Sequence, residues 1–190
     1  QAFAGTSGQS GYVDGSGAGV KFGGPFGVAA NATYLFVSDS ANNSIRSVLL
    51  AAPYTVATVA GSLSATAGST DSTGTTARFS TPAGIVSDAA NSRLYVADQG
   101  NHTIRMIDVS VSPATVTTIA GAAGTYGSTD GTNGATARFN TPTGLAINAA
   151  GTILYVSDQY YTKVRKIVLP AAPTAPTSSN VTVSTLTSTF

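Results

Sequence analysis

The sequence contains no cysteine, no tryptophan and no glutamate, and it has a single histidine, His102. Without cysteine there is no disulfide framework and no thiolate metal site. With one histidine and no glutamate, most zinc sites and most general acid–base arrangements are excluded within the chain. A serine or threonine nucleophile would still lack an activating base. We therefore predict that the protein is not an enzyme, that it has no catalytic residues, and that it binds no cofactor or metal.

Charge is also scarce. Charged residues make up 9% of the chain, where about a quarter is usual, and the formal net charge is +1. Lys163, Arg165 and Lys166 form the only basic cluster, which is too small for the phosphate contacts that dominate nucleic-acid binding. No apolar run reaches the roughly 18 residues that a membrane-spanning helix needs. We expect no nucleic-acid partner and no membrane span, and we expect a chain that begins at Gln1 to be processed or to be a segment of something longer.

Strand-forming and turn-forming residues dominate the composition instead. Serine and threonine supply about a quarter of the chain, and there are 21 glycines. Such a sequence is poor in helix formers and rich in residues that favour strands and turns. The composition predicts an all-β fold.

The sequence repeats itself three times with a period of about sixty residues, which indicates an array of supersecondary units. A Pro-x-Gly motif opens the first strand of each copy, at 25–27, 82–84 and 142–144. A second apolar strand ends in aspartate, at 34–39, 93–98 and 153–158. A third strand carries Ile-Arg or Val-Arg, and a fourth is rich in threonine and valine.

Four short antiparallel strands in each copy, repeated around an axis, describe the blades of a β-propeller. We predict one domain over 1–190, with blades at about 6–61, 62–121 and 122–190. The third blade contains a Pro/Thr/Ser-rich loop at 169–179. A β-sandwich is the alternative, but it gives no reason for such regular self-similarity.

The middle copy shows the motifs most fully, in the segments Thr81–Gly84, Leu94–Asp98, Asn101–Arg105 and Val116–Gly121. With their in-register counterparts over nearly the whole chain, these segments resemble the NHL repeat. The resemblance implies a propeller of about six blades that binds proteins, peptides or RNA, although some relatives are metal-dependent lyases. Tyr161 departs from the pattern where asparagine is expected, and Lys21 where arginine is expected. Because this fold serves many functions, the resemblance does not indicate which of them this chain performs.

Six of the eight aspartates occupy two repeated positions. Those that end the second strand precede an arginine by seven residues, in the pairs Asp39–Arg46, Asp98–Arg105 and Asp158–Arg165. A strand, a tight turn and a returning strand would place each pair side by side, so we predict charge-assisted hydrogen bonds that fasten the turn. A ring of carboxylates that binds cations is the alternative.

The other three aspartates lie in glycine-rich loops, at Asp14, Asp71 and Asp130. We predict that they form turns, because aspartate readily hydrogen-bonds nearby backbone. Their spacing also pairs them with the basic residue that follows, Lys21, Arg78 or Arg138.

Three blades do not close a propeller, which needs about four to eight. We predict that the ring is open, or that another chain or segment completes it. The partner would be further blades of a longer chain or copies of this one, in a homo-oligomer or filament. The fourth strands, at 54–62, 114–121 and 180–188, contain no charged residue, although exposed edges usually carry charge. We therefore expect other chains or sugars to cover these edges.

Four Asn-x-Ser/Thr sequons are candidate N-glycosylation sites, at Asn31, Asn42, Asn101 and Asn180. Candidate O-glycosylation sites lie in the Pro/Thr/Ser tract, at Thr174, Thr177, Ser178 and Ser179. Low charge with abundant serine and threonine suits a protein that glycans keep soluble, so we predict an extracellular or cell-surface location.

The function that we predict is a structural or adhesive scaffold that self-associates through its propeller blades. One alternative is a propeller that binds a peptide, protein or glycan, for which Tyr126, Tyr160 and Tyr161 are the hint. A lyase-like or lactonase-like enzyme is a further alternative, and it would require a bound divalent ion with imported ligands.

Overall fold

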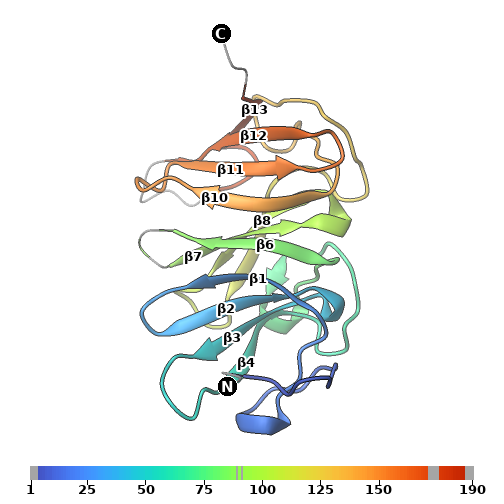
Figure 1. The fold of residues 1–190 in the computed structure, drawn as a ribbon. Coiled ribbons are helices and arrows are strands. Elements are labelled where there is room, and N and C mark those ends of the chain that lie inside the picture. The colour runs from blue at the N-terminus through green and yellow to red at the C-terminus, as the bar shows by residue number, and fades with distance from the viewer. Residues whose placement is uncertain (1–3, 89, 91, 171–175, 187–190) are drawn as a thin grey trace.

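The computed structural model describes residues 4–88, 90, 92–170 and 176–186. Three antiparallel sheets stand side by side, each built from strands that are consecutive along the chain (Figure 1). The sequence prediction of an all-β fold made of propeller blades is confirmed.

The first blade consists of β1 (Pro25–Ala30), β2 (Tyr34–Asp39), β3 (Ser44–Leu49) and β4 (Val56–Gly61). The second consists of β6 (Pro82–Ser87), β7 (Arg93–Asp98), β8 (Thr103–Asp108) and β9 (Thr115–Ala120), with β5 (Ser72–Thr73) beside β9. The third consists of β10 (Pro142–Ile147), β11 (Ile153–Asp158), β12 (Lys163–Val168) and β13 (Thr182–Thr185).

The helical segments are single 3-10 turns at η1 (Gly17–Gly19), η2 (Ser40–Asn42), η3 (Gly74–Thr76) and η4 (Gln99–Asn101). None of the helices within the described ranges has the length and apolar character needed to span a membrane.

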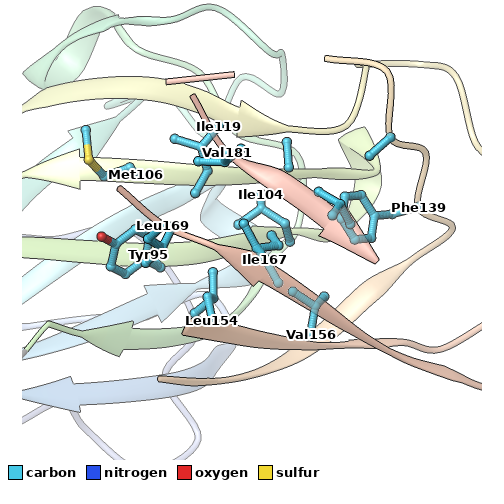
Figure 2. Packing of buried hydrophobic residues seen from close by; sticks show 14 residues of the cluster. Tyr95, Ile104, Met106, Ile119, Phe139, Leu154, Val156, Ile167, Leu169 and Val181 are labelled. Carbon is cyan, nitrogen blue, oxygen red and sulfur yellow. The ribbon is translucent and has the colours of Figure 1, made fainter. Parts of the chain in front are cut away.

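Neighbouring blades pack face to face. The second blade places Tyr95, Ile104 and Ile119 in a buried cluster with Leu154 and Ile167 of the third (Figure 2). An equivalent buried cluster joins the first and second blades. Because each fully buried apolar side chain contributes roughly 1.5–3 kcal/mol relative to exposure in water, these two interfaces are the main apolar stabilisation of the array.

The glycine of the Pro-x-Gly motif allows the innermost strands of neighbouring blades to approach closely. A Cβ atom on Gly27 would lie 2.5 Å from the carbonyl oxygen of Ala83, and one on Gly84 would lie 2.2 Å from that of Thr143. At Gly144, which packs on no other blade among the described residues, the nearest atom would be the movable hydroxyl of Ser157, at 2.9 Å. The glycine of the motif is therefore needed for close packing between blades rather than for the conformation of its own strand.

The chain's own glycine-rich loop pairs with the outer strand of each blade near the beginning of that strand. Gly15 exchanges two backbone hydrogen bonds with Val56 of β4, of 2.9 and 2.7 Å, and Gly131 does the same with Val183 of β13, at 3.0 and 2.9 Å. In the second blade the loop forms β5, which pairs with β9. A loop distant in sequence therefore supplies a partner for one or two residues of each fourth strand, and cover of the rest of these edges by other chains or sugars stays a prediction.

Candidate functional site

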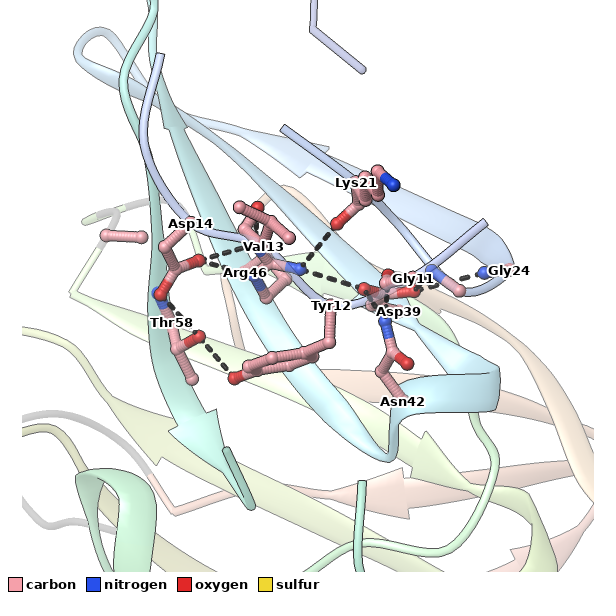
Figure 3. A network of polar contacts seen from close by, with 12 residues as sticks. Gly11, Tyr12, Val13, Asp14, Lys21, Gly24, Asp39, Asn42, Arg46 and Thr58 are labelled. Carbon is pink, nitrogen blue, oxygen red and sulfur yellow. Dashed lines mark hydrogen bonds and ion pairs between the residues drawn. The ribbon is translucent and has the colours of Figure 1, made fainter. Parts of the chain in front are cut away.

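One fully buried arginine in each blade joins two aspartates. Figure 3 shows the first case, where Arg46 donates from Nη1 to Asp39 Oδ2 over 3.0 Å and from Nε to Asp14 Oδ1 over 2.9 Å. The other two blades repeat the arrangement, with Arg105 to Asp98 at 2.8 Å and to Asp71 at 2.7 Å, and Arg165 to Asp158 at 3.2 Å and to Asp130 at 2.7 Å. The structure thus brings together every pair that the seven-residue spacing predicts.

The loop aspartates bond these same arginines rather than the basic residue that follows them. Arg78 donates from Nη1 to the carbonyl oxygens of Thr75 and Ala77, both at 2.7 Å, while Asp71 lies beside Arg105. Arg138 likewise bonds two backbone carbonyls. The predicted pairing of Asp14, Asp71 and Asp130 with Lys21, Arg78 and Arg138 is therefore wrong. The loop folds over the third strand of its own blade, and spacing along the chain carries no sign of that.

Each loop aspartate also holds the outer strand. Asp71 accepts hydrogen bonds from the backbone N–H and the hydroxyl of Thr118, both at 2.9 Å. Asp14 bonds Thr58, and Asp130 bonds Thr185, in the same way. One carboxylate therefore joins three separate segments of a blade: the loop, the buried arginine and the edge of the fourth strand.

The guanidinium groups are enclosed on their remaining sides. Each lies over a phenylalanine ring, 5.2 Å from the centroid of Phe22, 5.0 Å from Phe79 and 4.9 Å from Phe139. Such cation–π contacts favour a desolvated cation. In each repeat, the phenylalanine of the Lys-Phe or Arg-Phe dipeptide therefore stacks on the buried arginine of the same blade. That arginine also donates a hydrogen bond to the backbone carbonyl of the lysine or arginine that precedes the phenylalanine.

The environment of the carboxylates is that of structural groups. Burial raises the pKa of Asp98 above its usual value, although Arg105 and the amide of Asn101 favour its ionised form. Burial also raises the pKa of Asp158. For Asp130, burial acts to raise the pKa, but the backbone N–H of Thr185 and the Arg165 guanidinium outweigh it and hold the pKa below its usual value. Within the described parts of the chain, no three His or Asp side chains form a group that could hold a metal ion.

The turn asparagines belong to the same network. Asn42 and Asn101 are buried, and the amide nitrogen of each donates to the neighbouring aspartate, Asp39 or Asp98, over 2.7 Å. An N-linked glycan would be attached to that same nitrogen. The folded structure therefore argues against glycosylation of Asn42 and Asn101. Asn180 is exposed and Asn31 is partly exposed. Thr177 and Ser179 are exposed and Ser178 is partly buried, whereas Thr174 lies outside the described residues.

A second repeated contact links each turn to the next blade, and nothing in the sequence indicated it. Asn43, in the left-handed region with φ 51°, accepts a hydrogen bond at Oδ1 from the backbone N–H of Thr81, 2.7 Å away. His102, with φ 59°, accepts one at Nδ1 from Thr141, 3.1 Å away. Burial lowers the pKa of His102, which favours the neutral imidazole that this bond requires. The two acceptors differ in residue type, so the repeat pattern alone does not indicate their shared role.

The two end blades each leave one face without a neighbour. On the first blade, Phe26 and Val28 are 62% and 61% exposed, whereas their repeat counterparts in β6, Ala83 and Ile85, are at most 5% exposed. On the third blade, Val164 is 50% exposed. Val164 corresponds to Ile104, which is fully buried. These positions are thus open at the two ends of the array, although Val37, Val48 and Val56 on the end face of the first blade are buried with Val20.

The comparison with known proteins agrees with this repeat architecture. Over 128 residues, 65% of the chain, it is 35% identical to NHL repeat-containing protein 2 of Bos taurus and 34% identical to that of Homo sapiens. The repeats of this chain are thus similar to those of NHL repeat proteins. It spans only 17% of the length of these curated relatives. No family model matches the chain.

Solved structures show the same propeller fold as these NHL-type repeats. An auxiliary nutrient binding protein from Bacteroides ovatus superposes with a TM-score of 0.64 at 24% identity, over 78% of this chain and 38% of that one. A putative phosphatase from Bacteroides thetaiotaomicron superposes with a TM-score of 0.61 at 19% identity, over 85% of this chain and 35% of that one. At such identities the likeness extends to the fold alone, and proteins named for different functions share it.

Proposed function

We propose that this NHL-type segment is a non-catalytic binding module that assembles through the two open faces of its end blades, and that it serves as an extracellular scaffold. The observation that carries the proposal is the contrast between repeat-equivalent residues. Val28 is 61% exposed and Val164 is 50% exposed. Ile85 and Ile104, at the same positions of the second blade, are buried against the neighbouring blades. The repeated aspartates, which would otherwise be the candidate polar centre, are already engaged by arginines.

The two open faces are complementary to each other. The open face of the first blade corresponds to the face of the second blade that packs on the first. The open face of the third blade corresponds to the face of the second that packs on the third. A second copy can therefore use the contact that already joins blades within the chain, and two copies of three blades would make a closed ring of six, within the usual range of about four to eight. Such a pairing is head-to-tail, and a head-to-tail contact gives a ring where the rotation between subunits closes and an open polymer where it does not.

Sedimentation velocity at micromolar concentration tests the proposal. The 18.9 kDa chain is expected to sediment as a dimer. Val164→Asp and Val28→Asp, which place a charge on one face each, are expected to give folded monomers. Leu63→Asp, at an apolar residue that is 58% exposed in the loop after β4, is the matched control and should leave the dimer intact. Circular dichroism confirms that each variant is folded.

Mixing the two single-face variants makes the test specific for head-to-tail pairing. In the mixture one of the two interfaces of a ring joins two unaltered faces, so partial dimer formation should return. A folded wild-type monomer at all concentrations, or a dimer that both charge variants leave unchanged, would contradict the proposal. Open polymers would contradict closure into a ring.

A second candidate function, recognition of a peptide or glycan, rests on exposed aromatic residues at one end of the third blade. Tyr126 and Tyr160 are 65% and 70% exposed. Tyr126 packs on His102, whose Nδ1 accepts a bond from Thr141, while the backbone N–H of Tyr160 donates to Asn140. Both aromatic residues thus border the Asn140–Thr141 segment. Binding of a glycan or peptide library that Tyr126→Ala and Tyr160→Ala abolish, with the oligomeric state unchanged, would favour this function over the first.

The extracellular location rests on the scarcity of charge and on the exposed sequon at Asn180. Mass spectrometry of the native protein tests it. Glycan on Asn180 is expected, and unmodified asparagine there would contradict a glycan-solubilised scaffold.

A further inference from the structure

A cavity of about 730 Å³ lies between the first and second blades, away from both open faces. Its walls come from the beginnings of β2 and β4, the end of β3, η3, and the loop that joins β8 to β9. Cavities of roughly 300–1,000 Å³ are the usual size for small-molecule sites. The volume is therefore sufficient for one or two sugar rings.

The cavity exists because the first blade carries small residues where the second carries large ones. Ser47 of β3 lines it, and the same position of β8 holds Met106, which is buried with Tyr95 and Leu169 in the cluster between the second and third blades (Figure 2). On the opposite wall, Ala114 stands where the third blade has buried Val181. At these positions side chains fill the interface between the second and third blades, whereas the interface between the first and second blades leaves a cavity.

The lining is aromatic, hydroxylated and uncharged. Tyr34 and Phe36 line it with their ring centroids 6.0 Å apart. The hydroxyl-bearing residues of the lining are Ser47, Thr55, Thr58, Thr75 and Ser112. Three of these hydroxyls already have a partner within the protein: that of Thr58 donates to Asp14, that of Thr55 bonds Ser16, and that of Ser47 donates to the carbonyl oxygen of Ala57. No Asp, Lys, Arg or His is among the described lining residues, so a charged ligand would lose its hydration without gaining a partner.

Asn31, also in the lining, is held in a defined orientation. Its Oδ1 accepts hydrogen bonds from the backbone N–H groups of Thr33 and Tyr34, 2.9 and 2.7 Å away. Because the oxygen is engaged by the backbone, the amide nitrogen is the group of this side chain that can donate to a ligand.

We propose that this cavity between the first two blades binds a neutral pyranose sugar, a hexose or N-acetylhexosamine unit. A tyrosine ring beside a set of hydroxyl and amide groups offers an apolar surface for the C–H face of the sugar and hydrogen-bonding partners for its hydroxyls. The inference does not depend on ring closure, because the cavity lies within one chain.

Titration followed by NMR tests the site, with unglycosylated protein and with glucose, galactose and N-acetylglucosamine as probes. At least one probe should shift the amide signals of Ser47, Thr55 and Thr75 saturably. Glucose 6-phosphate is the charged counterpart of glucose and should bind at least about tenfold more weakly, since its phosphate finds no partner. The methyl glycoside of the same sugar separates two sources, because it binds only if the site accepts the end of a glycan chain as well as a free sugar.

Ser47→Met fills the cavity with the residue that the second blade uses, and Ala114→Val fills it with that of the third. Each should weaken sugar binding at least about tenfold, while Ser47→Met should leave the melting temperature unchanged or higher. Lys166→Met makes the equivalent change in the third blade, outside the cavity, and should leave binding unchanged. If Ser47→Met does not fold, Ala114→Val alone decides. No saturable shift with any of the three sugars, equal affinity for glucose 6-phosphate, or full binding by the filled variants would overturn the proposal.

Discussion

Arg105 and Asp71 are 34 positions apart in the chain, and their side chains meet at 2.7 Å, with the guanidinium fully buried and the carboxylate partly open to solvent. A second carboxylate, Asp98, bonds the same guanidinium 2.8 Å away. Breaking a buried ion pair is costly because it leaves an uncompensated charge in the interior. The arginine of each blade is therefore the point on which the blade's loop, turn and edge strand all depend.

Asp71→Asn should lower the free energy of unfolding by about 1–2 kcal/mol, because it removes a charge-assisted bond to Arg105 and weakens the bonds to Thr118. Urea denaturation at neutral pH measures it. Arg78→Ala is the control, since Arg78 bonds only backbone carbonyls in the structure. A loss for Arg78→Ala equal to that for Asp71→Asn, with no additivity in the double variant, would instead support an Asp71–Arg78 pair.

Protonation of His102 should destabilise the protein. Its pKa is lowered in the folded state by burial, so folding favours the neutral form. The contribution is therefore fully present above the unfolded value of about 6.5 and is lost as the pH falls below it. Melting temperatures at pH 7 and pH 5 should show this loss. His102→Asn, which copies Asn43 of the first blade, should keep the bond to Thr141 and reduce the loss; an undiminished loss in that variant would assign it to other groups.

Tyr161→Asn should raise the free energy of unfolding by about 1 kcal/mol, because it restores to the third blade an asparagine that donates to the turn aspartate. Asn101 donates to Asp98 over 2.7 Å, and Asp158 lacks that donor. Tyr160→Asn is the control, since both changes remove the contact between the two tyrosine rings and only the first adds the bond. Guanidinium denaturation that shows no gain for Tyr161→Asn over Tyr160→Asn would contradict the prediction.

Gly84→Ala should destabilise the fold by about 1–3 kcal/mol, as overpacking does, because the added Cβ would meet the backbone of the third blade at Thr143. Gly144→Ala, at the same motif position but without a described blade packed against it, should change the free energy of unfolding by less than about 0.5 kcal/mol under conditions where the chain is monomeric. Equal effects of the two substitutions would mean that the glycine serves its own strand rather than blade contact. Thermal unfolding of both variants gives the answer.

Much of the fold could be predicted because the constraints are local and repeated. A Pro-x-Gly motif, alternating apolar strands and an Asp seven residues before an Arg recur three times. Each copy therefore supports the structural interpretation of the other two. The Asp–Arg pairs of the second and third strands were accessible for the same reason, since a tight turn brings residues of that spacing together.

By itself the sequence determined the strands, their order within each blade and the charge pairs across the tight turn, because these depend on short-range periodicity and turn chemistry. Only the tertiary structure decided what the glycine-rich loops do. Asp71 reaches Arg105 and Thr118 across more than thirty residues, and such contacts depend on how the loop folds over the sheet. The same holds for the cavity beside Ser47, which arises from two opposing walls in different blades. A volume between elements is a property of their packing, and no single segment of the chain encodes it.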